Sequence, residues 1–345
     1  MVMSLRSSAA TGAIFLLCLM WVASYSTGQT FSESDDMDEN KKGWNLALPT
    51  LGGKQFWTDY RWWYGWRVQY NGTLDHWRLI DPSGIRRAWG GKQAMLEELE
   101  TVKKRAPGQD KIDEVVLLVH GLFRTKESMN PIVEQWEAAH GAQPSFRQSE
   151  SSPAKPSKIC VPVSYASTRT SIENHAAAFR ELAENLPGEP RISFVGHSLG
   201  NIVFRRAVGE WQKTGDPRNV LPRLNRAVML GPPNHGSAFA ASLSKLGVFE
   251  TLTGASGMHL GPAWDKLQSS LGTPPCPFAI VVGDISGSYL SNPLLEGPSD
   301  GIVTVEEAQL EGATETKTFP VLHSFLMSDP EIVKSTISFL GGGTL

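Results

Sequence analysis

The C-terminal part of the chain alternates short, largely apolar segments with amphipathic helical stretches, and this alternation most restricts the possible fold. The apolar segments are 114–121, 159–167, 191–198, 225–233, 278–284 and 316–323. Strands that are apolar on both faces and separated by helices predict a parallel sheet that is covered on two sides. We therefore expect a three-layer α/β domain over residues 107–345, with its chemistry at the carboxyl ends of the strands.

The third apolar segment runs directly into the turn Gly196-His197-Ser198-Leu199-Gly200 and then into an apolar helix. A Gly-x-Ser-x-Gly turn between strand and helix forces the serine into a strained conformation that small neighbours permit. This turn lifts the hydroxyl of Ser198 above the sheet edge, next to the unpaired N–H groups of the helix N-terminus. Ser198 is the predicted nucleophile, and the N–H of Leu199 is a predicted oxyanion donor.

A serine nucleophile needs a base, and three histidines follow Ser198 in the chain. His235 and His259 lie in loop sequences, whereas His323 follows the last predicted strand and precedes the last helix. His323 therefore leaves the sheet at the same edge as Ser198, and we predict that it is the base.

Two aspartates beyond the segment 278–283 could orient this histidine. Asp284 follows the strand directly, and Asp300 lies further along in "PSDGIVTVEEA". Position alone slightly favours Asp284, but an aspartate before or near glycine is also an ordinary turn former. The residues by themselves leave both candidates open.

A second oxyanion donor is predicted at the end of the first strand, in "VVLLVHGL". Gly121 allows the backbone to approach a substrate carbonyl closely, and the N–H of Leu122 could donate alongside that of Leu199.

Residues 44–106 differ sharply in composition, because seven of the eleven tryptophans lie between Trp44 and Trp89. Alternating apolar and polar residues with Asn-Gly and Pro-Ser-Gly turns predict three short antiparallel strands, followed by a helix. These elements are expected at 66–70, 76–80, 85–89 and 92–105. We expect a small Trp-rich βββα module whose tryptophans form its core, the alternative being a surface that stacks on glycans.

The N-terminus has the pattern of an export signal, with Arg6 in a polar start and the apolar stretch 13–23. The stretch is short for a transmembrane helix, so we expect a cleaved signal over residues 1–28 rather than a membrane anchor. The acidic segment 29–43 has almost nothing to bury and is predicted to be a flexible linker. The mature protein is expected to be secreted or periplasmic.

These stretches together resemble the α/β-hydrolase superfamily, and within it the secreted bacterial esterase/lipase group. The resemblance covers about residues 113–340 and depends on five motifs in order. They are "LLVHGL", "FVGHSLGNIVFRRAV", "AVMLGPPNHGSAFA", "SDGIVTVEEA" and "VLHSFLM". The resemblance implies Ser198 as nucleophile, His323 as base and Asp300 as the acid, which leaves Asp284 in reserve. The sequence departs from the family pattern at Asn201, where many relatives have a second glycine. It also departs in residues 237–275, which lack a long apolar lid helix.

In such a sheet, the strands near Cys160 and Cys276 are four inter-strand steps apart, or roughly 19 Å. A disulfide cannot span that distance, so we predict two unpaired thiols.

The resulting functional prediction is a secreted serine hydrolase that cleaves small-molecule or lipid carboxylic esters without a cofactor. The same residues would also serve an acyltransferase or amidase, and a third alternative is a glycan-binding or surface-binding protein with a vestigial hydrolase domain. The net charge of −3 and the absence of a basic stripe argue against nucleic-acid binding.

Overall fold

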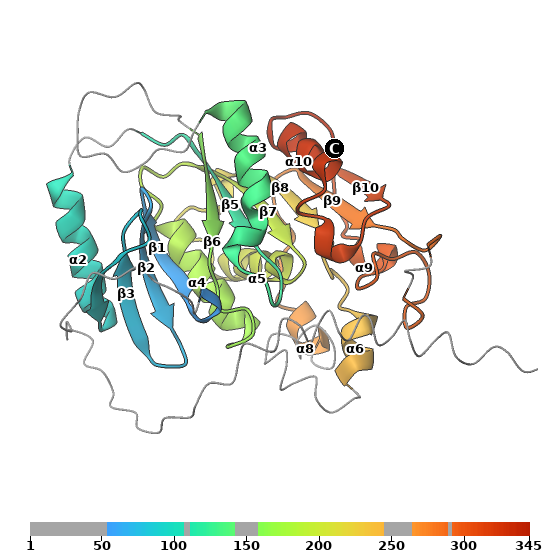
Figure 1. The fold of residues 1–345 in the computed structure, drawn as a ribbon, viewed down its shortest axis with the longest axis horizontal. Helices are drawn as coiled ribbons and strands as arrows, with labels where there is room; N and C mark the ends of the chain where they lie inside the picture. Colours follow the sequence, from blue (N-terminus) through green and yellow to red (C-terminus); the bar gives the residue numbers. More distant parts are fainter. Residues whose placement is uncertain (1–53, 107–110, 142–157, 245–263, 289–291) are drawn as a thin grey trace, which may run out of the picture.

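The computed structural model describes residues 54–106, 111–141, 158–244, 264–288 and 292–345. It contains two β-sheets, and the strands of the first precede those of the second along the chain (Figure 1). Within these residues, no helix has the length and apolar character needed to cross a bilayer. The predicted signal, the predicted linker and much of the segment 237–275 lie outside the described residues.

The second sheet has six strands in the order β10-β9-β8-β7-β5-β6, and every neighbouring pair is parallel. The strands are β5 (Glu114–Val119), β6 (Lys158–Val163), β7 (Arg191–His197), β8 (Leu224–Leu230), β9 (Phe278–Gly283) and β10 (Glu315–Phe319). All six predicted strands are therefore confirmed. Because they are parallel, the loops that follow them emerge at one edge of the sheet.

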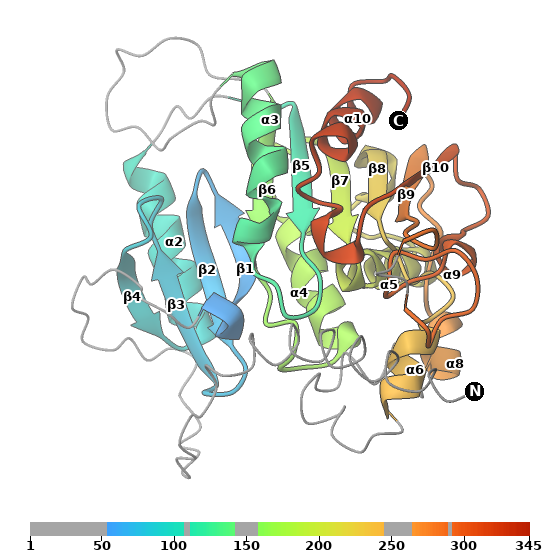
Figure 2. The same ribbon diagram turned by 45° about the vertical axis from the view of Figure 1, so that its right-hand side comes forward.

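Helices cover both faces of this sheet, which confirms the three-layer α/β prediction (Figure 2). On one face lie α4 (Ile172–Glu184) and α5 (Leu199–Thr214), and on the other lie α3 (Asn130–His140) and α10 (Pro330–Leu340). Alternate residues of β5 belong to different hydrophobic clusters, with Leu117 on the α4 side. Shorter elements are η2 (Lys126–Met129), η3 (Leu221–Arg223), α6 (Ala238–Ser244), α8 (Trp264–Gln268), α9 (Val305–Ala308) and η4 (His323–Phe325).

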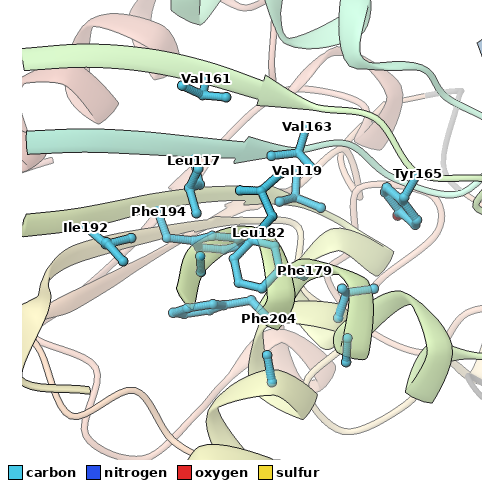
Figure 3. Close-up of a cluster of buried hydrophobic side chains, with 14 of the residues drawn as sticks. Leu117, Val119, Val161, Val163, Tyr165, Phe179, Leu182, Ile192, Phe194 and Phe204 are labelled. Carbon is cyan, nitrogen blue, oxygen red and sulfur yellow. The ribbon is translucent and has the colours of Figure 1, made fainter. Parts of the chain in front are cut away.

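Aromatic packing fixes α5 against the strand that precedes it (Figure 3). Phe194 of β7 stacks on Phe204 of α5, with ring centroids 3.9 Å apart and planes inclined by 13°. Phe179 of α4 meets both rings edge-on at 6.1 Å. Each such pair contributes about 0.5–1.5 kcal/mol beyond area burial. The turn between β7 and α5 is thus held between two well-packed elements.

The first sheet is antiparallel, with four strands in chain order and a helix packed on them. Its elements are η1 (Lys54–Phe56), β1 (Thr58–Trp63), β2 (Trp66–Asn71), β3 (His76–Ile80), β4 (Arg86–Gly90) and α2 (Lys92–Arg105). The three predicted strands and the helix are present as β2, β3, β4 and α2, whereas β1 was not predicted. Its alternation is obscured because the pairing register shifts between Asp59 and Arg61.

The first sheet is joined closely to the second. Asp59 donates its backbone N–H to the carbonyl of Ser164, just beyond β6, at 2.9 Å, and its carboxylate accepts the N–H of Ser164 at 2.8 Å. Trp62 and Trp63 are only 6% and 8% exposed and belong to the cluster that also contains Phe194. None of the described tryptophans in this sheet is exposed. Trp62 and Trp63 are therefore part of the core, as expected, whereas the other described tryptophans of this sheet are partly buried.

The loop between β2 and β3 is longer than an Asn-Gly turn. Asn71 is the last residue of β2, and the positive φ of 43° occurs at Asp75 instead. The side chain of Asn71 is buried, and its Oδ1 accepts the N–H groups of Thr73 at 3.0 Å and Leu74 at 3.2 Å. The side-chain oxygen of Asn71 is thus engaged in the loop.

Candidate active site

Ser198 is the single residue between the end of β7 and the start of α5. Its backbone has φ 52° and ψ −122°, a conformation that is strained for any residue other than glycine. The N–H of Ser198 donates to the carbonyl of Leu230, at the end of β8, at 2.9 Å. The residue is 9% exposed. The sharp strand-to-helix turn predicted from the sequence is therefore present.

Two glycines allow neighbouring elements to pack tightly around this serine. A Cβ at Gly200 would lie 2.4 Å from the carbonyl oxygen of Val119 and 2.7 Å from that of His120. A Cβ at Gly121 would lie 3.0 Å from the Cβ of Ser198. A side chain at either position would collide with these atoms. Glycine at both positions therefore allows the loop after β5 to lie directly against the serine.

His323 is bound to Asp300 by two hydrogen bonds. Its Nδ1 lies 2.7 Å from Asp300 Oδ2, and its backbone N–H donates to the Asp300 carbonyl at 3.0 Å. The other carboxylate oxygen, Oδ1, accepts the N–H groups of Ile302 at 3.0 Å and Val303 at 2.8 Å. Both side chains are buried, with 8% and 0% of their surface exposed. Asp300 is therefore held in one orientation, with one oxygen left for the imidazole.

Asp284 makes a different set of contacts. Its Oδ1 accepts the N–H of Ser286 at 2.9 Å and the hydroxyl of the same residue at 2.6 Å. These hydrogen bonds lower the pKa of this half-exposed carboxyl. The structure thus brings Asp300, and not Asp284, to His323. Of the other histidines considered, His235 is exposed and His259 lies outside the described residues.

The ring of His323 lies beside the end of β8 and beside the ring of the residue that precedes Ser198. A Cβ at Gly231 would be 2.9 Å from His323 Nδ1, and Gly231 follows Leu230, the residue that accepts the N–H of Ser198. The ring of His197, the residue before the serine, has its centroid 4.8 Å from that of His323. Three strand ends therefore converge on the predicted nucleophile and base.

His197 has a role that the sequence analysis did not predict. Its Nε2 lies 3.0 Å from the carbonyl oxygen of His323, to which it donates, so it holds the backbone of the predicted base. Burial lowers the pKa of His197 well below its usual value, and the charges of His323 and Arg124 lower it further. His197 is therefore neutral, with the proton on the nitrogen that faces His323.

The two predicted oxyanion donors, Leu122 and Leu199, come from different elements next to Ser198. Leu199 is the first residue of α5, and Leu122 lies in the turn after β5. That turn is braced, because Arg124 N–H and His120 Nδ1 both donate to the carbonyl of Gly121, at 3.2 and 2.9 Å. The hydroxyl of Tyr165 donates to the His120 carbonyl at 2.7 Å.

Asn201 supports the turn from beneath. Its Nδ2 donates to the carbonyl of Ser198 at 3.1 Å and to that of Leu230 at 3.2 Å. The side chain is completely buried. The residue that departs from the family pattern thus ties α5 to the end of β8.

No metal-binding group is found in the described part of the chain, where no cluster of three or more His, Cys, Asp or Glu has suitable geometry. A cavity of about 530 Å³ lies between the first sheet and α4, and its lining does not include Ser198 or His323. Cys160 and Cys276 are both buried and do not form a disulfide with each other, as predicted.

The strand order, with the serine after β7, the histidine after β10 and the aspartate on the loop after β9, defines an α/β-hydrolase. Residues 109–256 match the family described as "Putative serine esterase (DUF676)". The fold is that of the α/β-hydrolase superfamily, and the family match, which covers less than half of the chain, supports ester hydrolase activity. No curated protein sequence matches the chain.

Several solved structures are similar to this chain. The mature lipase BlEst2 of Bacillus licheniformis is 17% identical, with 68% of this chain and 92% of that chain covered and a TM-score of 0.46. The metagenomic carboxyl esterase MGS0156 is 14% identical, with coverage of 68% and 77% and a TM-score of 0.43. The phospholipase PlaB of Legionella pneumophila is 21% identical over 57% of this chain, which spans 45% of that protein, with a TM-score of 0.40.

Proposed function

We propose that the protein hydrolyses carboxylic esters through an acyl-enzyme formed on Ser198, with His323 as the base and Asp300 as the residue that orients it. The observation that carries this proposal is the buried hydrogen bond of 2.7 Å between His323 and Asp300, at the sheet edge where Ser198 stands. With Nδ1 engaged by the carboxylate, the proton-accepting nitrogen of the imidazole is Nε2.

In the first half of the reaction, His323 Nε2 takes the proton of the Ser198 hydroxyl as Oγ bonds to the ester carbonyl carbon. The N–H groups of Leu122 and Leu199 stabilise the negative oxygen, and Asp300 stabilises the imidazolium. When the intermediate collapses, the bond to the alcohol oxygen breaks and His323 gives that oxygen its proton. Water then attacks the acyl-enzyme with the same base, which releases the acid and restores Ser198.

We also propose that the protein is exported. The support is the apolar stretch 13–23 after Arg6, followed by small and polar residues through Gly28. Sequencing the N-terminus of the protein recovered outside the cytoplasm tests this proposal. A mature N-terminus near residue 29 is expected, and an intact N-terminus in the cytoplasmic fraction would contradict it.

The catalytic proposal is tested with a fluorophosphonate probe and a series of 4-nitrophenyl esters of increasing chain length. The wild-type protein should bind one probe molecule at Ser198 and release nitrophenol. Ser198→Ala should abolish both, whereas Ser328→Ala, which removes an exposed serine from the loop before α10, should change neither. Equal labelling of the Ser198→Ala variant would place the nucleophile elsewhere.

A further inference from the structure

Arg124 connects the two loops between which an ester would bind. Its backbone N–H closes the turn that carries Leu122, by donating to the carbonyl of Gly121 at 3.2 Å. Its side chain crosses to the loop after β10, where Nη2 donates to the carbonyl of Ser324 at 3.2 Å. Ser324 directly follows His323. The guanidinium therefore lies at the rim of the proposed active site, on the side where the oxyanion turn meets the histidine loop.

The charge of this guanidinium is not neutralised within the described part of the chain. Arg124 forms no ion pair there, and its one side-chain acceptor is the neutral carbonyl of Ser324. Half-burial lowers its pKa, and no carboxylate is close enough to raise that pKa again. Its positive charge also acts on His197, the residue before Ser198, because repulsion from this charge contributes to the lowered pKa of His197.

A partly desolvated cation without a counter-ion is costly unless a ligand supplies the opposite charge. The guanidinium offers five N–H donors in a planar fork, and the carbonyl of Ser324 uses only one side of it. None of the Arg124 nitrogen atoms is a buried donor without a partner, so the remaining N–H groups face solvent. This fork is suited to a carboxylate or a phosphate.

We propose that Arg124 is a specificity-determining residue that binds an anionic group on the substrate, and that the preferred substrates are esters that also carry a carboxylate or phosphate on the acyl or the alcohol part. This inference rests on the proposed ester hydrolysis at Ser198. A simpler role would be that Arg124 only tethers the oxyanion turn to the histidine loop. A tether alone would affect neutral and anionic esters equally, so the two roles are separable.

The test uses two matched pairs of esters. In the first pair, 4-nitrophenyl hexanoate is compared with the mono-4-nitrophenyl ester of adipate, where a carboxylate replaces the terminal methyl group. In the second pair, phenyl butyrate is compared with the butyrate ester of 3-hydroxybenzoate, where the charge is on the alcohol part. For each pair, kcat/KM is measured for the wild-type protein, Arg124→Ala, Arg124→Lys and the control Arg169→Ala. Arg169 is exposed and lies over the ring of Phe56, near the first sheet.

In at least one pair, Arg124→Ala should lower kcat/KM for the anionic ester about 10- to 100-fold more than for its neutral partner. Arg124→Lys should keep part of the preference, and Arg169→Ala should keep all of it. Added salt should reduce the wild-type preference. Equal losses for anionic and neutral esters in both pairs would show a tether and overturn the proposal. Failure of the wild-type protein to hydrolyse any of the four esters would instead contradict the ester hydrolysis itself.

Discussion

His323 Nδ1 lies 2.7 Å from the carboxylate of Asp300, although Asp284 follows the end of β9 directly. The reason is the path of the loop after β9. The N–H of Ile285 donates to the carbonyl of Ser299 at 2.8 Å, so the chain returns to the strand end before it reaches Asp300. Asp284 is instead held by two hydrogen bonds from Ser286.

Replacing Asp300 tests the proposed role of this pair. Asp300→Asn removes the charge that stabilises the imidazolium and presents the histidine with an amide, so kcat should fall by up to about 10⁴-fold. Asp284→Asn is the matched control and should reduce kcat by less than a few-fold, since it changes only the two hydrogen bonds from Ser286. Both variants are compared by steady-state kinetics, with circular dichroism as the check on folding. An exchange of the two results would assign the acid to Asp284.

Asn201 offers a second test, because its amide joins two backbone carbonyls at the serine turn. Asn201→Ala should lower the free energy of unfolding by about 1–3 kcal/mol, since two hydrogen bonds in a fully buried site are lost. It should also lower kcat, because the strained conformation of Ser198 loses a support. Urea denaturation and esterase kinetics measure the two effects.

The control for Asn201 is Asn185, whose Nδ2 also donates to a backbone carbonyl, that of Glu181 at 2.8 Å, but in a partly exposed position. Asn185→Ala should change stability by less than about 1 kcal/mol and leave kcat unaltered. If Asn201→Ala is as mild as this control, the turn does not depend on that amide.

Local sequence was sufficient to predict the elements of the large sheet. The pattern around Ser198 specifies a strand, a sharp turn and a helix within a few residues, so both the fold class and the geometry of the turn could be inferred. β1 could not be inferred from the sequence, because its buried residue Asp59 does not fit the usual apolar pattern of a strand. That carboxylate is buried only because Gln69, Ser164 and Arg67 satisfy it, and these partners come from β2 and from the residue after β6.

The supporting residues of the site were also beyond sequence reasoning. His197 contacts the carbonyl of His323, and Arg124 contacts that of Ser324, over large separations along the chain. A hydrogen bond to a backbone carbonyl leaves no pattern in side-chain types. The choice between Asp284 and Asp300 was likewise open from position alone, since the return of the loop depends on backbone hydrogen bonds.

Cys160 and Cys276 provide a third prediction. Cys160 and Cys276 are buried, and burial raises the pKa of both thiols, that of Cys276 to about 11. The folded mature protein should therefore react very slowly with a thiol reagent at neutral pH. After denaturation without reductant, the same protein should react with two equivalents of the reagent, one for each thiol. A value of zero under denaturing conditions would indicate a disulfide, which the strand order forbids within one chain.

The last prediction concerns stability in acid and rests on buried histidines near the oxyanion turn. Burial lowers the pKa of His120 to about 4 and that of His175 to about 3, against an ordinary value of 6.5. His175 packs edge-on against Tyr165, which stacks on His120, and neither ring nitrogen of His175 has a hydrogen-bond partner. Both rings are therefore neutral in the folded protein over a range where they are protonated in the unfolded chain.

A histidine with a lowered pKa in the folded state stabilises the fold fully above pH 6.5, and this contribution is lost as the pH falls towards the lowered value. Between pH 7 and pH 4.5, His175 alone should reduce the free energy of unfolding by about 2–3 kcal/mol. His175→Leu should remove this pH-dependent loss of unfolding free energy, so the variant should gain stability relative to the wild-type protein as the pH falls. His235→Leu, at an exposed position, should show the wild-type pH dependence. Urea denaturation at several pH values measures the difference, and parallel curves for the wild-type protein and His175→Leu would show that His175 takes up its proton without unfolding.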